Sequence, residues 1–276
     1  MTYSTLMAHL DLRPSNEGLL RLTADLAERC KARVVGIAAC QPMAVAYDDG
    51  YMSAEVIDQD RAERERELDQ ARAGFHAALQ GKVTDLEWRS TISYMSLTNY
   101  IVEQARAADL LITGPNRKDS SPDSSRLVNI GDLVMRAGRP VLIVPPGVDR
   151  LDLESVVVGW KDSRETRRAV VDALPLLRLA GRVLVVEIAE QEDIADARGR
   201  VKDVVGWLSR HGVKAEALAA PASGGDAARL NAIIQEHGAG LMVAGAYGHN
   251  RLREWVLGGV TRNLLLSPDR CALVSH

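Results

Sequence analysis

The stretch GLMVAGAYGHNRLREWVLGGVTRNLLLSPDRCALVS (240–275) decides the fold, because it repeats the pattern of DLLITGPNRKDSSPDSSRLVNIGDLVMRAGRPVLIV (109–144) at a shift of 131 residues. Each stretch begins and ends with a short apolar run and holds a polar loop and a helical segment between the two. The positions that agree without a gap are Ala108 with Ala239, Leu110 with Leu241, Gly114 with Gly245, Leu133 with Leu264, Arg139 with Arg270 and Leu142 with Leu273. The repeat predicts two related units in one chain.

Outward from these stretches, apolar runs alternate with longer amphipathic segments along the whole chain. In the first half the predicted strands are 5–10, 33–39, 86–94, 109–113 and 140–144, and the predicted helices are 16–29, 54–79, 97–107 and 128–137. In the second half the predicted strands are 155–160, 182–188, 216–221, 241–245 and 271–275, and the predicted helices are 164–179, 193–210, 226–237 and 259–267. Because strands that alternate with helices form parallel sheets through right-handed crossovers, each half is predicted to be a doubly wound α/β sandwich with five parallel strands.

The segment PPGVDRLDLE (145–154) separates the two halves. It carries two prolines and a glycine between apolar strands, which is typical of a linker. We therefore expect one domain at 1–146 and a second at 153–276. A chain of 276 residues is long enough for two domains of about 140 residues each.

The composition excludes several classes of function. Hydrophobic residues at 46% and charged residues at 26% are normal for a globular protein, and a net charge of −3 does not favour nucleic acid as a partner. The three cysteines, without metal-ligand spacing, are expected to be small buried residues rather than disulfides or zinc ligands. We find no signal peptide and no membrane-spanning run, so we expect a cytoplasmic protein that has no membrane partner.

The segment GAYGHNRLREWVLGGVT (245–261) carries the most specific chemistry. Gly245 and Gly248 follow a predicted strand, where the missing Cβ permits tight turns and close approach of a ligand. Gly258 and Gly259 precede a predicted helix, whose N-terminal N–H groups and positive dipole end bind phosphate. The loop adds donors and positive charge from His249, Asn250, Arg251 and Arg253. A glycine-rich turn before a capped helix would explain the same residues without a ligand, so both interpretations stay open.

With these residues, the chain resembles the universal stress proteins of the tandem type, and the resemblance extends over the whole chain by the order of its elements. ATP-binding members of that family carry Gly, two residues, Gly, nine residues, Gly and then Ser or Thr. Gly245, Gly248 and Gly258 match this spacing, whereas Gly259 stands where the hydroxyl residue belongs and Thr261 lies two residues further on. The segment VVVGWKDSRETRRAV (156–170) is similar to the family's first strand and the following helix start.

The resemblance implies a candidate site for ATP, with magnesium, in the second half. Its phosphate-binding residues would be Gly245, Gly248, His249, Asn250, Arg251, Gly258, Gly259, Val260 and Thr261. Its adenine side would be formed by Trp160, Lys161 and Ile188. The family has an acidic residue beside the adenine, and Lys161 occupies that position in the second half, whereas the first half keeps an acid, Asp11.

The corresponding loop of the first half, GPNRKDSSPDSSRLV (114–128), has lost its glycines. Arg117, Leu127 and Val128 replace three glycines of the second half, and only Gly114 remains. Bulky side chains stand where a phosphate would need bare backbone, and two aspartates add negative charge. We predict that the first half binds no nucleotide triphosphate; the alternative is a loop that forms a different cradle.

The resemblance also implies how the halves associate. Single-domain members of the family pair through their last strands, so PVLIV (140–144) and CALVS (271–275) are expected to pack the halves into a pseudo-dimer within one chain. Such pairing removes an exposed terminal strand, which would favour aggregation. Whole chains are candidates for further pairing into a homodimer.

Three other segments carry weaker signals. The helical stretch 54–79 mixes acidic and basic residues, with Ile57, Ala71, Phe75 and Leu79 on its expected inner face, and is interpreted as a solvated amphipathic helix rather than a partner-binding one. The stretch 44–53 is interpreted as a long loop, with a flap over a site as the alternative. SGGDA (223–227) is similar to the phosphate loop of adenylating ATP pyrophosphatases but follows the wrong strand, so it is interpreted as a turn.

The sequence thus predicts a stress-response or regulatory protein with one candidate adenine-nucleotide or anion site in the second half. The alternatives are a scaffold that binds no nucleotide and acts through protein contacts, and an adenylating enzyme. We identify no catalytic residues and no metal ligands, since there is no Walker lysine and no pair of histidines on one helical face. Slow hydrolysis of ATP is the only enzymatic activity that this interpretation leaves open.

Overall fold

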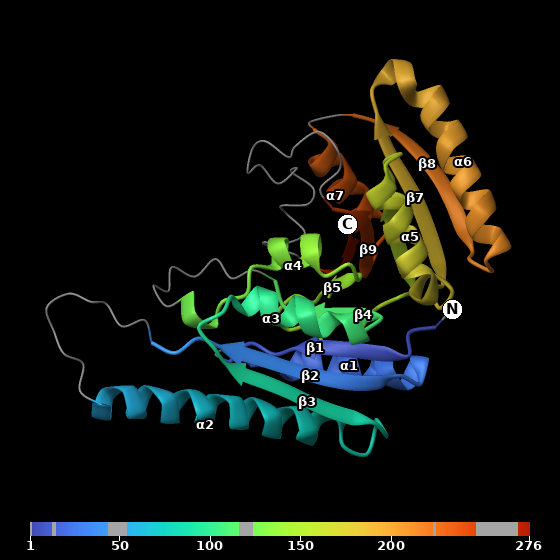
Figure 1. Cartoon of the computed structure of the whole chain (residues 1–276). Coiled ribbons are helices and arrows are strands. Elements are labelled where there is room, and N and C mark those ends of the chain that lie inside the picture. The colour runs from blue at the N-terminus through green and yellow to red at the C-terminus, as the bar shows by residue number, and fades with distance from the viewer. Residues whose placement is uncertain (1, 13–14, 44–53, 116–123, 223–224, 247–269) are drawn as a thin grey trace, which may run out of the picture.

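Ten strands from both halves form one mixed sheet in the order β3-β2-β1-β4-β5-β10-β9-β6-β7-β8 (Figure 1). The computed structural model describes residues 2–12, 15–43, 54–115, 124–222, 225–246 and 270–276. The first half contributes β1 (Thr5–His9), β2 (Arg33–Cys40), β3 (Leu86–Ile92), β4 (Leu110–Thr113) and β5 (Val141–Ile143). The second half contributes β6 (Ser155–Gly159), β7 (Arg182–Ala189), β8 (Ala215–Pro221), β9 (Leu241–Gly245) and β10 (Cys271–Ser275).

Neighbouring strands run parallel within each half, and the halves meet at an antiparallel pair of β5 and β10. In that pair Leu142 lies opposite Leu273, and both side chains are fully buried. The last strand of one half therefore pairs with the last strand of the other. This confirms the predicted fold class: two doubly wound, five-stranded parallel α/β sandwiches in tandem, packed as an intramolecular pseudo-dimer.

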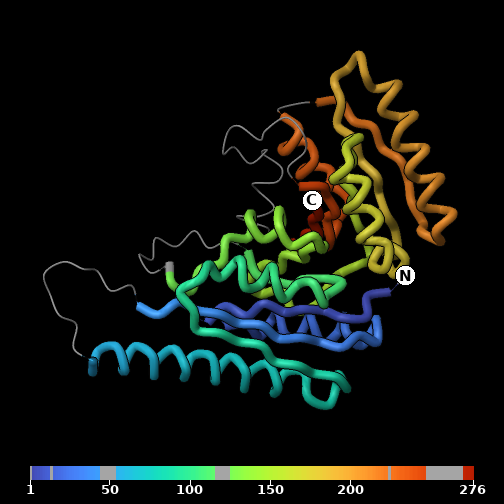
Figure 2. The backbone as a smooth tube through the Cα atoms, viewed as in Figure 1, coloured from blue at the N-terminus to red at the C-terminus, as the bar shows by residue number. Residues whose placement is uncertain are grey.

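Helices cover both faces of the sheet (Figure 1), and the chain can be followed through both layers as a tube in Figure 2. One core cluster joins the sheet to α1 (Glu17–Cys30), α2 (Ala54–Leu79), α5 (Arg164–Leu177) and α6 (Ile194–Arg210). The other joins it to α3 (Leu97–Gln104), α4 (Ile130–Arg136) and α7 (Asp226–Glu236). Three 3-10 turns complete the described elements: η1 (Ala105–Ala107), η2 (Ser124–Arg126) and η3 (Gln191–Asp193).

The strands are buried on both faces because they supply side chains to both clusters. In β6, Val156 and Val158 belong to the cluster beneath α5, and Val157 belongs to the cluster beneath α7. Continuous apolar runs of this kind are typical of parallel strands between two helical layers. The observed elements agree with the predicted alternation throughout the described residues, and the predicted last helix, 259–267, lies outside them.

Contacts away from the sheet also join the halves. The hydroxyl of Tyr3 donates to the backbone carbonyl of Asp172 on α5 at 2.6 Å. The guanidinium of Arg168 donates to the carbonyl of Gly138 at 2.8 Å. Within the predicted linker, Leu151 and Leu153 are buried in the core cluster on the α1 and α5 side. The connection is therefore packed against both halves, and the division at 1–146 and 153–276 stays a prediction.

The inner face of α2 differs from the prediction at its first turns. Phe75 and Leu79 are fully buried as expected, but Ile57 is 48% exposed. Figure 1 shows the start of α2 extending past the end of β3, and Ile57 belongs to the first turn of this helix. Further along α2, the first buried residue is a charged one, Arg64. The assignment of Ile57 to the core was therefore wrong.

Candidate functional site

The candidate site of the second half lies at the carboxyl ends of β6 and β9. These strands are neighbours, and the helices α5 and α7 that flank them lie on opposite faces of the sheet. Ligands of open α/β sheets bind at such a switch point. β6 ends at Gly159 and β9 ends at Gly245, so neither strand ends in a residue with a side chain.

Gly245 is required by packing as well as by any ligand. A Cβ built on Gly245 would lie 2.5 Å from the backbone nitrogen of Thr166 and 2.6 Å from the carbonyl carbon of Glu165. Both atoms belong to the first turn of α5, whose backbone cannot give way as a flexible side chain would. The end of β9 therefore approaches α5 at a distance that only glycine permits.

The N-terminus of α5 is already capped and neutralised by its own residues. Ser163 is the N-cap, and its hydroxyl accepts a hydrogen bond from the backbone N–H of Thr166 at 3.3 Å. Glu165, only 2% exposed, accepts a hydrogen bond from Arg164 and places a negative charge in the first turn. Burial alone would raise the pKa of Glu165, but hydrogen bonds from Arg164, its own amide and Ser163 outweigh it, so the pKa is lowered. This helix end therefore offers little positive potential to a second anion.

The three residues predicted for the adenine side lie in different surroundings. Trp160 is half-buried against the cluster beneath α5, and Ile188 packs against the cluster beneath α7. Lys161, which follows Trp160 in the sequence, is exposed. Trp160 is held by its backbone N–H, which donates to the carbonyl of Val186 at 2.7 Å. The structure thus places the side chains of Trp160 and Ile188 on opposite faces of the sheet, at its carboxyl edge.

Most of the predicted phosphate loop lies outside the described residues. This applies to Gly248, His249, Asn250, Arg251, Gly258, Gly259, Val260 and Thr261. The stretch 44–53 and the first two residues after Ala222 are outside them as well. Of the predicted phosphate-binding residues, the structure positions Gly245, and the others stay predictions.

In the first half, the residues at the corresponding strand ends carry side chains that are hydrogen bonded to each other. His9 ends β1 and Thr113 ends β4, and their side chains are hydrogen bonded, with 2.9 Å between Nδ1 and Oγ1. His9 is 7% exposed and Thr113 is 1% exposed. Burial lowers the pKa of His9 to about 4, although the nearby Asp11 acts in the opposite direction. By the strand registers, this pair occupies the positions of Gly159 and Ala244 in the second half.

A buried arginine cluster, formed by Asp60, Arg64, Glu67, Ser125 and Arg126, closes the carboxyl edge beside β2. The guanidinium of Arg126 donates to both carboxylate oxygens of Glu67 on α2, at 2.7 and 2.8 Å. Arg64 pairs with Asp60 at 2.9 Å and donates to the hydroxyl of Ser125 at 3.0 Å. The cluster therefore fastens η2, the described end of the loop after β4, onto α2.

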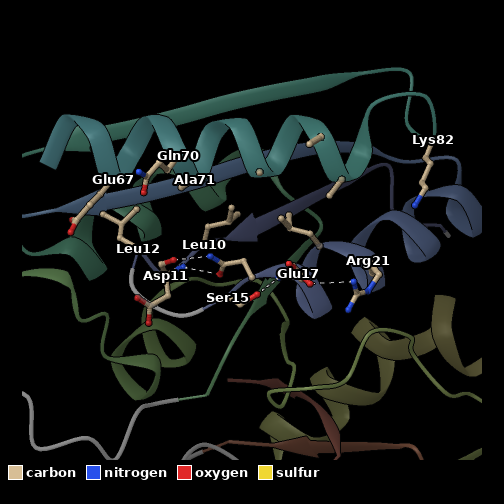
Figure 3. A pocket seen from close by; sticks show the side chains of 15 residues that line it. Leu10, Asp11, Leu12, Ser15, Glu17, Arg21, Glu67, Gln70, Ala71 and Lys82 are labelled. Carbon is tan, nitrogen blue, oxygen red and sulfur yellow. Dashed lines mark hydrogen bonds and ion pairs between the residues drawn. The ribbon is translucent and has the colours of Figure 1, made fainter. Parts of the chain in front are cut away.

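A groove of about 520 Å³ runs between α1 and α2 in the first half (Figure 3). Leu10 and Leu20 line it together with small residues of α2, and a Cβ built on Gly74 would meet no described atom within 4 Å. Asp11 lies at one end, where Asn16 clamps its backbone by donating to the Asp11 carbonyl at 2.7 Å and accepting from its N–H at 3.2 Å. The charged lining residues are Asp11, Glu17, Arg21, Glu67 and Lys82.

The described residues form neither a metal-ligand cluster nor a membrane-spanning helix. Among them, no group of three or more His, Cys, Asp or Glu side chains is placed to hold a metal ion. None of the described helices is long and apolar enough to cross a membrane. Cys40 and Cys271 are buried as predicted, whereas Cys30 is half-buried.

Comparisons with known proteins identify the fold. No family model and no curated protein matches the sequence. Among solved structures, a universal stress protein from Archaeoglobus fulgidus superposes with a TM-score of 0.72 at 14% identity, covering 98% of this chain and 97% of that chain. A functionally unknown protein from Pseudomonas aeruginosa gives a TM-score of 0.59 at 15% identity, covering 99% of this chain and 92% of that one.

A putative universal stress protein, also from Pseudomonas aeruginosa, gives a TM-score of 0.58 at 16% identity, with 99% of this chain and 93% of that chain covered. The chain therefore has the universal stress protein fold in tandem over its whole length, as the sequence resemblance implied. At these identities the comparisons establish the fold, and the ligand has to be argued from this chain's own residues.

Sequence reasoning missed the His9–Thr113 bond and the buried arginine cluster. The two partners of the bond are 104 residues apart in the chain, and only the register of β1 against β4 brings them together. A signal was present, because aligning the first strands of the halves places His9 on Gly159. No comparable signal marked Arg126, since an arginine in a polar loop is ordinarily exposed.

Proposed function

We propose that this chain is a stress-response or regulatory protein of the universal stress protein type that binds an adenine nucleotide in its second half, at 153–276. The observation that carries the proposal is the difference between the strand ends of the two halves. In the second half β6 and β9 both end in glycine, Gly159 and Gly245, and Gly245 begins the glycine-rich loop 245–261. Open α/β sheets bind their ligands at this place.

The phosphates are assigned to the glycine-rich loop and not to α5. Ser163 already caps the first turn of α5, and the Glu165 carboxylate already complements its dipole. The loop 245–261 offers glycines at its start and before the predicted helix, with three basic side chains between them. ATP with magnesium is the ligand that the spacing of Gly245, Gly248 and Gly258 favours.

The first half is proposed to bind no nucleotide triphosphate. His9 and Thr113 are buried and hydrogen bonded at its strand ends, and the Arg126–Glu67 pair fastens the end of the loop that follows β4. Binding there would require buried polar groups to exchange their partners, which is costly because each group left unpaired loses its hydrogen bond without regaining water. One nucleotide per chain is the expected stoichiometry.

Calorimetric titration with ATP and magnesium tests the proposal. The wild-type chain should release or absorb heat with one site per chain, and Gly248→Val should weaken binding at least about tenfold because a branched side chain enters the phosphate loop. Arg117→Val, at the equivalent position of the first half, is the matched control and should change nothing. Absence of heat from the wild-type chain at millimolar ATP would refute the nucleotide site.

A scaffold that binds no nucleotide is the second candidate, favoured by the positive charge of Lys161 at the adenine side and by Gly259 in place of a hydroxyl residue. Mass spectrometry of protein taken directly from its expression host separates the two candidates. Adenine nucleotide retained in equimolar amount would contradict the scaffold. A ligand-free protein that also gives no calorimetric heat would support it.

We assign no catalytic role to any described residue. Phosphate release from ATP, measured in the same samples, is expected to remain at the level of the Gly248→Val variant. A release that is faster in the wild-type chain and saturates with ATP would contradict that assignment.

A further inference from the structure

β8 forms one end of the ten-stranded sheet, and within the described residues it pairs only with β7. Figure 1 shows β8 and α6 at one extremity of the molecule, far from β3 at the other end. An edge strand presents a row of unpaired N–H and C=O groups, which another strand can bind. The outward backbone groups of β8 determine which strand can bind there.

Hydrogen bonds at the two ends of β8 fix which residues face outward. The carbonyl of Lys214 accepts from the N–H of Val183, and the N–H of Ala222 donates to the carbonyl of Ala189, both at 2.9 Å. The register between these points is continuous, so the even-numbered residues of β8 bond to β7. Because the direction alternates along a strand, the backbone groups of Ala215, Ala217 and Ala219 point away from the sheet.

Pro221 agrees with this assignment. It is also an odd-numbered residue of β8, so its missing N–H would have faced outward and no bond to β7 is lost. Proline in a strand is confined to such positions. The open part of the edge is therefore 215–219, with three N–H donors and three carbonyl acceptors on alanine residues.

The two ends of the sheet differ in their protection. On β3, Glu87 is bound by the guanidinium groups of Arg33 and Arg89, and Trp88 adds a bulky side chain. Charged residues of this kind protect an edge against pairing. β8 carries only one charged residue, Glu216, and the exposed side chain of Ala217 is a methyl group. Of the two edges, β8 is therefore the one suited to receive another strand.

We propose that two copies of this chain associate through β8, pairing antiparallel about Ala217. This register places Ala217 opposite its own copy and Ala215 opposite Ala219, so each outward donor meets an outward acceptor. It sets Glu216 opposite Leu218 of the other copy, so the two carboxylates are not directly opposed. The chain already uses the same geometry once, since β5 and β10 join the halves as an antiparallel pair of edge strands.

Light scattering coupled to size-exclusion chromatography across a concentration series tests the proposal. The chain has a mass of 30.0 kDa, and the wild-type protein should shift toward twice that mass as its concentration rises. Ala217→Pro removes an outward N–H and should raise the dimer dissociation constant at least about tenfold, since two hydrogen bonds are lost across the interface. Hydrogen exchange of 215–219 should slow in the dimer.

Two variants keep the result interpretable. Ser90→Pro, at an outward position of β3, is the matched control and should leave the mass unchanged. Ala217→Lys is a second disruption that requires no change in backbone conformation, and it should give the same shift as Ala217→Pro. Circular dichroism and the melting temperature should be those of the wild type for each variant.

A wild-type chain that remains at 30.0 kDa throughout the series overturns the proposal. So does a dimer that survives both Ala217 variants, or one that Ser90→Pro dissociates, because the interface would then lie elsewhere. The proposal is also overturned if the chain stays monomeric and its β8 amides are protected from exchange only when a peptide of sequence AEALAAP is added. The edge would then bind other strands without pairing with its own copy. None of these outcomes depends on nucleotide.

Discussion

The two halves share one fold and differ at the ends of their central strands. In the first half, His9 and Thr113 form a buried hydrogen bond at these strand ends. In the second half the same positions are Gly159 and Ala244, and the next residue, Gly245, lies against the backbone of α5. The comparison teaches that a duplicated fold can keep its core while the residues at its strand ends diverge.

The arginine–carboxylate pairs near these strand ends also differ between the two halves. The buried arginine cluster holds the loop after β4 against α2, so polar groups of the first half satisfy one another. In the second half, the nearest equivalent is the pair of Arg200 and Glu187, which joins α6 to β7 and leaves the arginine 37% exposed. The arginine of the first-half pair is buried, whereas the arginine of the second-half pair is partly exposed to solvent.

The largest expected effect comes from adding a methyl group at the end of the fourth strand of each half. Gly245→Ala should lower the free energy of unfolding by about 3 kcal/mol or more, because the new Cβ would overlap backbone atoms of α5. Gly114→Ala, at the equivalent position, should change it by less than about 1 kcal/mol, since its Cβ meets no described atom within 4 Å. Urea denaturation measures both. Equal losses would contradict the close approach of β9 to α5.

The next effect concerns the buried arginine cluster. Arg126→Ala should lower the free energy of unfolding by about 2 to 3 kcal/mol, because it leaves the Glu67 carboxylate largely buried without its partner. Arg200→Ala in the second half should cost less, since Arg200 is more exposed and solvent screens its pair with Glu187. Denaturation of both variants under the same conditions checks the order. A larger loss for Arg200→Ala would reverse this part of the comparison.

The pH dependence of stability isolates His9. Its pKa is about 4 in the folded chain and 6.5 as the reference value for the unfolded chain, so between these values the unfolded chain binds more protons. Stability contributed by neutral His9 is therefore complete above pH 6.5 and decreases as the pH falls toward 4. From pH 7 to pH 5 we expect a loss of about 2 kcal/mol. His9→Asn should remove this part of the slope in denaturation curves, and an unchanged slope would show that another group causes it.

Part of this comparison could be predicted from the sequence and part could not. The alternation of apolar runs and helices predicted the element order, because that order depends on local sequence patterns. The family resemblance predicted that 140–144 pairs with 271–275. The bond between His9 and Thr113 depends on strand register, which no local pattern encodes. The exposure of Ile57 depends on how far α2 extends past the sheet.

The residues of the candidate site are predicted from their spacing in the sequence, which carries no information on their contacts. Gly245 is predicted to be a ligand-binding glycine, and the structure shows that glycine is also required there because β9 approaches the backbone of α5. The prediction places Trp160 and Ile188 together on the adenine side, yet they pack toward opposite faces, because Gly159 is in register with Val186 and Trp160 is therefore in line with the residue before Ile188. Sequence spacing identifies the edge of the sheet, whereas the side-chain directions follow from strand alternation.

Gly159 gives the smallest effect on stability and the sharpest test of the comparison. A Cβ there would lie 3.1 Å from the terminal methyl of Met242 and 3.3 Å from a methyl of Leu230, and the ends of flexible side chains can move by the few tenths of an ångström required. Gly159→Ala also reduces the entropy of the unfolded chain, so the net change in free energy of unfolding should be within about 0.5 kcal/mol. The fold alone therefore does not demand glycine at this position.

If the second half binds nucleotide at the ends of β6 and β9, Gly159→Ala should weaken ATP binding in calorimetry while the denaturation curve stays unchanged. Unchanged binding would place the ligand away from the end of β6, and the contrast with His9 would then concern packing alone.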